Sequence, residues 1–269
     1  MRRVEIKGVV RNVSPLRIGN RGVVDFTSTA TVQLLKNSRG IPYIPGSSWK
    51  GVFRSTGEVI ARKKGLRVCT GLTGDTCVDR IPDFQNLIEK DIEKAKKVFW
   101  EKTCLNCKVF GAPSILSSVY FFDSYPFNYK IGVKAIIAIS RENGAVSRGA
   151  LATAEYLEPN TTFSFLLSGE NIPNYAIGYI LSIMKEIHDG LSQVGGYKSR
   201  GFGFVKFDKL EMRITHYSEK SGSGSSLLPL DEFDSKAEYT QGELSGDEFF
   251  KKNSSLFEVF NNARIQYPM

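Results

Sequence analysis

The chain has 269 residues, of which 41% are hydrophobic and 24% are charged, and its formal net charge is +8. This content provides enough apolar surface for one large domain or two small ones. No apolar run approaches the roughly 20 residues that span a bilayer, and the N-terminus lacks the apolar region of a signal peptide. We therefore expect a cytoplasmic protein without a membrane span.

Charge divides the chain into a basic body and an acidic tail. Residues 1–217 contain 31 Lys and Arg against 19 Asp and Glu, whereas residues 218–269 contain 5 against 9. Lysines and arginines that neutralise phosphates release condensed counterions, so the basic body favours a polyanionic partner. Plain solubility is the alternative explanation.

The first half of the chain begins with a predicted strand at about residues 4–10, where apolar residues alternate with charged or small ones. A polar loop follows over 16–39. A proline–glycine turn at 45–46 then precedes a helix that ends near residue 64. Residues 66–110 contain all four cysteines and a polar, charged helical segment, which indicates an inserted subdomain with its own stabilising device.

The second half is predicted to contain three strands, a helix and a further strand, at residues 119–123, 135–139, 161–167, 174–191 and 204–207. Residues 218–246 are rich in Ser, Gly and acid, which predicts a linker, and residues 249–260 have the pattern of a short amphipathic docking helix. Strands interspersed with two main helices predict an α+β domain with an antiparallel sheet.

The start of the first helix is a candidate phosphate site. Gly46 forms a tight turn, and Ser47 and Ser48 are residue types that cap helices. A helix N-terminus offers backbone N–H groups and the positive end of a dipole, and the cations Lys50 and Arg54 lie one turn apart on one face. An ordinary strand–turn–helix unit with a solvated basic face explains the same residues equally well.

A glycine-rich loop supplies a second candidate phosphate site, formed by Gly195, Gly196, Lys198, Arg200, Gly201 and Gly203. Glycines permit positive φ angles and close backbone approach, so successive N–H groups can surround an anion. The loop is not a Walker motif, because no Gly-Lys-Ser/Thr closes it. The alternative is a tight helix-to-strand connection with cations on its surface.

The four cysteines predict a structural metal site. Cys69 and Cys77 are separated by seven residues, and Cys104 and Cys107 by two. The second spacing places two thiolates one turn apart, and four thiolates complete a tetrahedral zinc site that leaves no position for catalysis. Four scattered buried thiols are the alternative.

Histidine chemistry is not a credible route to catalysis in this chain. Its two histidines are His188, on the apolar stripe of a predicted helix, and His216, at the start of the predicted linker. Neither belongs to a Ser-His-Asp arrangement, and the sequence has no histidine pair of the ribonuclease kind. Any cleavage would depend on a carboxylate with a divalent metal ion such as Mg²⁺ or Mn²⁺.

Two segments together carry a resemblance to a known family. Residues 41–54 (IPYIPGSSWKGVFR) and 195–207 (GGYKSRGFGFVKF) resemble the N-terminal signature and the glycine-rich loop of the RAMP superfamily of CRISPR-associated proteins. The resemblance covers residues 1 to about 215. Members of this superfamily bind or cut RNA. The resemblance implies a ferredoxin-like, RRM-type core in which the sheet face and the glycine loop lie close to RNA.

Two further segments resemble the backbone subunits of type III interference complexes. In those subunits an aspartate in the loop after the first strand is required for target-RNA cleavage. The resemblance therefore implies a catalytic role for Asp25. The family aspartate usually lies closer to the proline–glycine turn, at a position that Ser28–Thr29 occupies here. A turn-capping role is the alternative for Asp25. Residues 139–151, with Arg141 and Arg148, resemble the thumb hairpin that reaches over guide RNA.

The resulting prediction is an RRM-like core over 1–217, with a cysteine subdomain at about 66–110, a thumb region at about 125–160, and a linker and tail over 218–269. We expect a subunit that binds guide RNA along its phosphates, cleaves complementary single-stranded target RNA with a divalent metal, and contacts other RAMP subunits. Three alternatives stay open. They are a non-catalytic scaffold of the same complex, a stand-alone RNA-processing endoribonuclease, and a zinc-containing interaction protein unrelated to nucleic acid.

Overall fold

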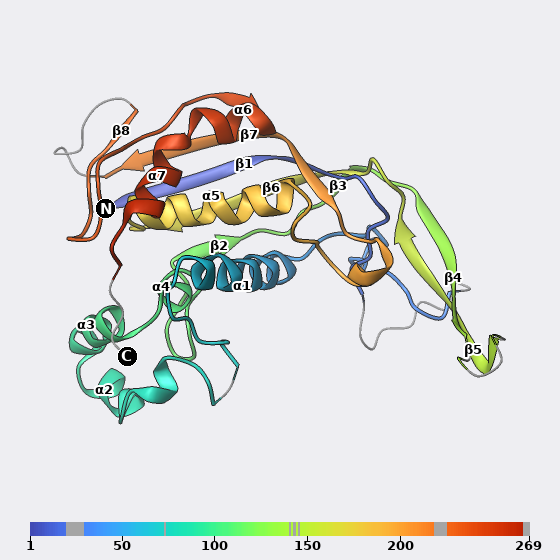
Figure 1. Cartoon of the computed structure of the whole chain (residues 1–269), viewed down its shortest axis with the longest axis horizontal. Coiled ribbons are helices and arrows are strands. Elements are labelled where there is room, and N and C mark those ends of the chain that lie inside the picture. Colours follow the sequence, from blue (N-terminus) through green and yellow to red (C-terminus); the bar gives the residue numbers. More distant parts are fainter. Residues whose placement is uncertain are drawn as a thin grey trace.

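The computed structural model describes residues 1–19, 30–72, 74–139, 141, 144, 146–217 and 225–265. Its centre is one antiparallel sheet with a layer of helices on one face (Figure 1). None of the helices in these ranges is long and apolar enough to cross a membrane.

The sheet has the strand order β10-β7-β1-β6-β2, and β3 pairs with β6 beside β2. Its strands are β1 (Arg2–Asn12), β2 (Val119–Phe121), β3 (Pro126–Asn128), β6 (Thr162–Glu170), β7 (Val205–His216) and β10 (Glu243–Ser245). Alternation along β1 gives the sheet one buried and one open face: Val4, Ile6 and Val10 are buried on the helical side, whereas Lys7 on the other face is exposed.

Two helices cover one face of this sheet. α1 (Gly46–Lys63) follows β1 and α5 (Asn174–His188) follows β6, so the core has the chain order strand–helix–strand–strand–helix–strand. With the spatial order β7-β1-β6-β2, this is a ferredoxin-like arrangement, and the predicted α+β fold is confirmed. Trp49 of α1 packs edge-on against Phe165 of β6, with ring centroids 5.3 Å apart. Phe53 stacks on the same ring, with centroids 6.4 Å apart.

A long hairpin projects from one end of the core (Figure 1). β4 (Ile131–Ile139) and β5 (Val146–Leu157) form a separate two-stranded sheet that begins with the pair Ile131–Leu157. Leu157 also exchanges backbone hydrogen bonds of 3.0 and 2.8 Å with Leu16, just after β1, which fixes the base of the hairpin to the core. The strand predicted from apolar residues at 135–139 is therefore one arm of a hairpin that extends from the sheet.

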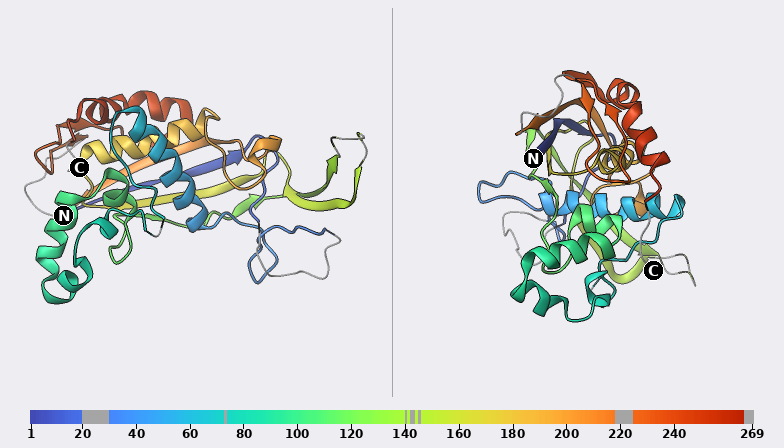
Figure 2. Two further views of the ribbon diagram at one scale, coloured as in Figure 1. Left: turned by 60° about the horizontal axis from the view of Figure 1, so that its bottom comes forward. Right: turned by 90° about the vertical axis from the view of Figure 1, so that its left-hand side faces the viewer.

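The cysteine segment forms a small subdomain at the opposite end of the molecule (Figure 2). It contains a 3₁₀ turn η1 (Val78–Arg80) and the helices α2 (Phe84–Lys90), α3 (Ile92–Lys102) and α4 (Leu105–Phe110). Its buried cluster is separate from the main core and combines the four cysteines with Ile81, Phe84, Ala95 and Phe99. A second core this small needs the additional stabilisation that its cysteines can provide.

The predicted linker is wrong for the part of the tail that the structure describes. Residues 225–265 fold onto the main core as β8 (Ser226–Leu227), β9 (Ala237–Glu238), β10, α6 (Gly246–Lys252) and α7 (Ser254–Asn262). The docking helix predicted over 249–260 is two helices, because the helical conformation is interrupted at Asn253. The buried Asn253 side chain donates to Phe249 O at 2.8 Å. Phe249, Leu256 and Phe260 are buried as expected of a docking segment, whereas the serine-rich composition of the predicted linker did not indicate that Leu227 and Tyr239 are buried in the core.

The tail also completes the start of α5. This helix has no cap from its own preceding residue, Pro173. The Asp234 carboxylate accepts the backbone N–H groups of Asn174 at 2.9 Å and Tyr175 at 3.1 Å. A carboxylate at a helix N-terminus satisfies free donors and complements the dipole, so the tail is an integral part of the domain.

Candidate nucleic-acid interface and metal centre

The serine caps predicted for α1 are wrong. The N-cap residue is Pro45, and neither Ser47 nor Ser48 makes a capping hydrogen bond, because both lie within the first turn. The Gly46 N–H instead donates to Asp123 Oδ1 at 2.8 Å. A carboxylate thus already occupies the start of this helix, where a bound phosphate was expected.

Packing also accounts for the glycine in this turn. A side chain at Gly46 would place its Cβ 2.2 Å from the backbone oxygen of Phe121 in β2. Only glycine permits so close an approach of α1 to the sheet edge. The ordinary strand–turn–helix explanation is therefore sufficient for Gly46.

Lys50 and Arg54 share a face of α1 but have different surroundings. Lys50 is half-buried, and burial together with the charge of Arg54 lowers its pKa. No ion pair of Lys50 is present in the described part of the chain. Arg54 turns its guanidinium toward the cysteine subdomain, where Nη1 donates to Gly111 O at 3.0 Å. Of the two cations, Lys50 is the one that remains available to an RNA phosphate.

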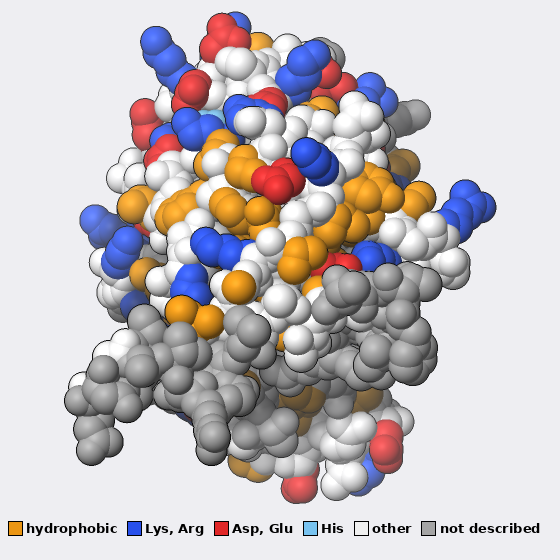
Figure 3. All heavy atoms as spheres, turned by 90° about the vertical axis from the view of Figure 1, so that its right-hand side faces the viewer, with side chains coloured by type: hydrophobic (Ala, Val, Ile, Leu, Met, Phe, Trp, Pro, Cys, Tyr) orange, Lys and Arg blue, Asp and Glu red, His pale blue; other side chains and the backbone are white. Residues whose placement is uncertain are grey.

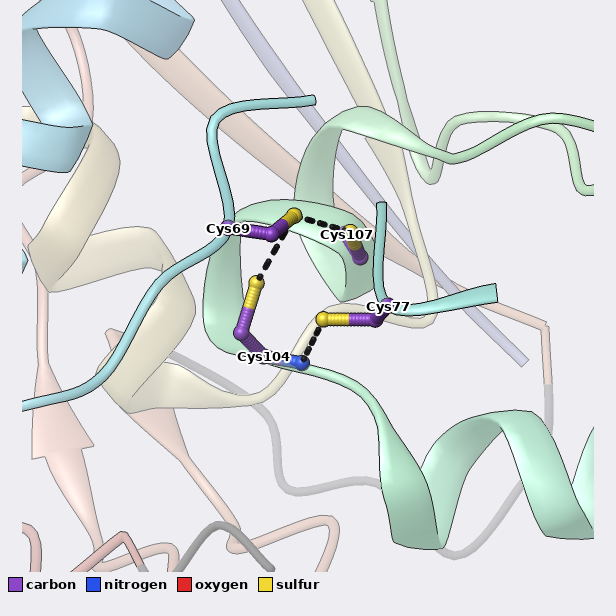
Figure 4. Close-up of side chains that lie close together, drawn as sticks. All are labelled: Cys69, Cys77, Cys104 and Cys107. Atoms are coloured by element: carbon purple, nitrogen blue, oxygen red, sulfur yellow. Dashed lines mark hydrogen bonds between the residues drawn. The ribbon is translucent and has the colours of Figure 1, made fainter. Parts of the chain in front are cut away.

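The structure brings the four cysteines together (Figure 4). All four are buried and unpaired by disulfides, and their Sγ atoms lie within 4.8 Å of one another. Cys69 Sγ is 3.3 Å from Cys107 Sγ and 3.8 Å from Cys104 Sγ. Zn–S bonds of about 2.3 Å in a tetrahedron place sulfurs roughly 3.8 Å apart, so these residues fit a metal ion with little rearrangement.

The cluster is assembled from separate pieces of backbone. Cys69 and Cys77 lie in the loop between α1 and η1, Cys104 is the N-cap of α4, and Cys107 is in its first turn. The Cys104 N–H points to Cys77 Sγ at 3.4 Å. Hydrogen bonds with Cys104 and Cys107 lower the pKa of Cys69, whereas hydrogen bonds with Cys104 and Cys69 raise the pKa of Cys107. The protons of the four thiols are therefore shared within one cluster.

The glycine loop is held tightly against the segment after β1. A Cβ at Gly195 would lie 2.3 Å from Arg17 O, and the Gly196 N–H donates to this same oxygen at 2.8 Å. Gly203 is equally confined, with a Cβ position 2.1 Å from Val194 O. Gly201, with a φ of +81° and open space around it, is exposed. The N–H of Gly196 is therefore committed to the fold, which contradicts a phosphate cradle at that position.

Cations and aromatic rings gather where this loop meets the base of the hairpin. We call this set the basic–aromatic cluster; it consists of Arg17, Lys134, Tyr197, Lys198, Arg200 and Phe202. The guanidinium carbons of Arg17 and Arg200 lie 4.9 and 5.2 Å from the centre of the Tyr197 ring. The Lys134 ammonium of β4 lies 5.6 Å from the centre of the Phe202 ring. Figure 3 shows this end of the molecule, where Lys and Arg side chains lie beside exposed apolar ones.

The members of this cluster differ in exposure. Lys134, Lys198 and Arg200 are exposed, whereas Arg17 is only 8% exposed and Phe202 only 3%. Buried Arg17 and Phe202 thus support the rings and the loop, and the three exposed cations face solvent. The sequence prediction included Lys198 and Arg200 and missed Lys134 and Arg17, since strand pairing alone brings these segments together.

A strip of exposed aromatic side chains was also missed. Tyr120, Phe122, Tyr125, Phe127 and Tyr129 are each between 41% and 61% exposed, along β2, β3 and the start of β4. Alternation within two runs, 120 and 122 and then 125, 127 and 129, was a visible signal in the sequence, because alternate residues of a strand share a face.

The open face of the sheet does not match the expectation of an RNA-binding surface. Cross-strand and same-strand ion pairs hold several of its cations, at 3.0 Å for Lys7–Glu211, 2.8 Å for Arg11–Asp208 and 2.9 Å for Arg3–Glu5. Paired charges give little net attraction for phosphate. The hairpin end is the more suitable surface.

Two predicted residues cannot be placed. Asp25 lies outside the described residues, as does the side chain of Arg148 in β5. Arg141 is exposed in the turn region between β4 and β5, at the far end of the hairpin. His188 is buried, as its place on an apolar stripe predicted, and its Nδ1 accepts the Phe207 N–H at 3.1 Å.

The fold and the hairpin end define a ferredoxin-like domain with a basic surface and a buried cluster of four thiols whose donor set fits a metal ion. The family model of the RAMP superfamily matches residues 9–206, and the chain belongs to this superfamily. A comparison with curated proteins gives no match. Membership indicates a CRISPR-associated role in RNA binding, with RNA and the other proteins of a CRISPR complex as partners.

Proposed function

We propose that this protein is a backbone subunit of a type III CRISPR interference complex that binds guide RNA along its phosphates. The basic–aromatic cluster carries the proposal, because it places three exposed cations at the base of a projecting hairpin in a chain of the RAMP superfamily. Lysine and arginine contacts with phosphate position an RNA, while base pairing by the guide supplies specificity.

Four parts of the chain have a role in this function. Lys134, Lys198 and Arg200 contact phosphates, and Lys50 extends this surface along α1. The β4–β5 hairpin, with Arg141 and Arg148, is the thumb that reaches over the guide. The exposed aromatic strip offers faces on which unpaired bases stack, a contact worth about 1–3 kcal/mol per base.

The proposal is tested by RNA affinity in two matched double variants. Lys198→Ala with Arg200→Ala removes two cations of the cluster, and Lys94→Ala with Lys97→Ala removes two exposed cations of α3 at the opposite end. The first pair should weaken binding of unrelated single-stranded RNAs alike and reduce the slope of log K against log salt by up to about 0.7 per contact. The second pair should leave affinity near that of the wild type. Equal effects of the two pairs would refute a localised site.

The metal centre is proposed to hold one structural zinc ion through Cys69, Cys77, Cys104 and Cys107. Buried thiolates at near-tetrahedral spacing support this identity. Free thiols also suit a cytoplasmic protein, since the cytoplasm keeps cysteines reduced. Elemental analysis of protein purified without added metal should give about one zinc per chain. A folded, metal-free protein with intact thiols would contradict this assignment.

Cleavage of target RNA is the second proposed activity. Its support is the resemblance of the loop that contains Asp25 to the catalytic loop of type III backbone subunits. The carboxylate would hold a divalent ion such as Mg²⁺ or Mn²⁺ that stabilises charge on the transferring phosphate. Asp25→Ala should abolish metal-dependent cutting in the assembled complex and leave guide and target binding intact. Cutting at the wild-type rate would indicate a scaffold subunit instead.

A further inference from the structure

The side chain of Arg54 connects α1 to the cysteine cluster. Its Nη2 lies 3.7 Å from Cys107 Sγ and 3.9 Å from Cys69 Sγ, within hydrogen-bond range of sulfur. Its Nη1 donates to the backbone oxygen of Gly111, directly after α4, at 3.0 Å. One guanidinium thus contacts two candidate ligands and the end of α4, the helix that carries Cys104 and Cys107.

The surrounding backbone leaves room for this guanidinium and for little else. The loop after Cys69 passes so close that a Cβ at Gly71 would lie 2.5 Å from Arg54 Nε, and Gly71 has a φ of +72°. The Arg54 side chain is only 19% exposed. Glu58, one turn further along α1, is 3.9 Å from Nε. The geometry directs the positive group toward the sulfurs and away from solvent.

Charge explains why a cation is placed there. A divalent metal ion bound by four thiolates carries a net charge of −2, and an uncompensated charge of this size is costly in a buried site. Lys108 of α4 is buried, and its ammonium lies within electrostatic range of Cys104 and Cys77 as well as of Asp231, so it adds positive charge near the cluster. Arg54 supplies it on the side of Cys69 and Cys107, with N–H groups that donate to sulfur.

We propose that Arg54 is a positioning residue of the metal centre, which orients Cys69 and Cys107 and offsets the charge of their metal-bound thiolates. This proposal rests on the proposed metal site. It assigns Arg54 a role different from the phosphate contact that its place beside Lys50 predicted. Through Arg54, α1, the helix that carries Lys50 of the proposed RNA-binding surface, would also stabilise the cysteine subdomain.

The test measures the affinity of the full chain for Co²⁺, a spectroscopic probe of tetrahedral thiolate sites, by competition with a chelator. Arg54→Met removes the charge and the donors, and Arg54→Lys retains the charge but not the planar fork of guanidinium donors. Arg62→Met removes an exposed cation of the same helix. Arg54→Met should lower Co²⁺ affinity about 10- to 100-fold, as loss of groups that hold metal ligands does elsewhere. The Co²⁺ affinity of Arg54→Lys should lie between those of Arg54→Met and the wild type, and that of Arg62→Met should equal the wild-type value.

The absorption spectrum at saturating Co²⁺ separates a weakened site from a misfolded chain, because a folded variant regains the tetrahedral thiolate spectrum. In metal-saturated protein, Arg54→Met should also leave the salt slope of RNA binding unchanged. Wild-type Co²⁺ affinity in Arg54→Met, or an equal loss in Arg62→Met, would overturn the role of Arg54. A wild-type chain that binds no Co²⁺ would instead overturn the metal site itself, and this proposal with it.

Discussion

Replacing one glycine of α5 tests whether the C-terminal tail is part of the domain. Gly178 lies where α7 crosses α5, and a Cβ added there would be 2.0 Å from Leu256 O and 2.9 Å from Phe260 Cβ. Gly51 is also inside a helix, α1, but a Cβ added to it meets nothing within 4 Å. Alanine at these two positions changes helix propensity equally and packing only at Gly178.

The expected magnitudes have opposite signs. Alanine in a helix interior is favoured over glycine by roughly 0.5–1 kcal/mol, so Gly51→Ala should stabilise the protein by about that amount. At Gly178 the new methyl group would overlap a backbone carbonyl of α7, and overpacking of this kind costs roughly 1–3 kcal/mol. The cost exceeds the propensity gain, so Gly178→Ala should be net destabilising by up to about 2 kcal/mol. For a chain of this size, 1 kcal/mol moves Tm by roughly 2–4 °C.

Urea and thermal unfolding followed by circular dichroism measure both variants, with limited proteolysis to report release of α7. Gly178→Ala should lower the urea midpoint and expose the tail to protease, whereas Gly51→Ala should raise the midpoint. Stabilisation by both substitutions would show that α7 does not pack on α5 in solution, and the description of the tail would be wrong.

Further predictions concern protonation and helix capping. Burial lowers the pKa of His188 despite the opposing charge of Asp247, so the unfolded chain binds more protons below about pH 6.5 and stability should fall as pH drops through that value. His188→Gln should reduce this dependence more than His216→Gln does, and an unchanged pH profile would contradict the buried neutral ring. Asp234→Ala removes the cap of α5 and should cost about 0.5–2 kcal/mol in urea unfolding, while Asp234→Asn, which keeps an acceptor, should cost less. An Ala variant no less stable than the Asn variant would argue against the cap.

Local pattern predicted those parts of the fold whose signal is contained within one segment. The alternation of Val4, Ile6 and Val10 predicted β1, and the helical spacing from Ile177 to Ile187 predicted α5. The linker prediction over 218–246 failed because serine- and glycine-rich composition outweighed the few apolar residues, such as Leu227 and Tyr239, that are buried in the core. Composition averages over a segment, whereas packing depends on a small number of positions within it.

The site shows the same division. Spacing predicted that the four cysteines would converge, since Cys104 and Cys107 are one helical turn apart and an insertion with few apolar residues needs a further source of stability. Helical periodicity placed Lys50 and Arg54 on one face correctly, but it gave no information on the loop at Gly71 that faces Arg54. The pairing of Lys134 with the glycine loop depends on the hairpin base and has no local signal.

The central claim is that this protein binds guide RNA, and the most direct test is the nucleic acid that accompanies it. Native protein should be purified at low ionic strength, because phosphate contacts weaken steeply with salt. If the protein binds guide RNA, RNA of defined size should co-purify and should be released by high salt. Protein free of nucleic acid under these conditions, or carrying only fragments of random length, would contradict the account.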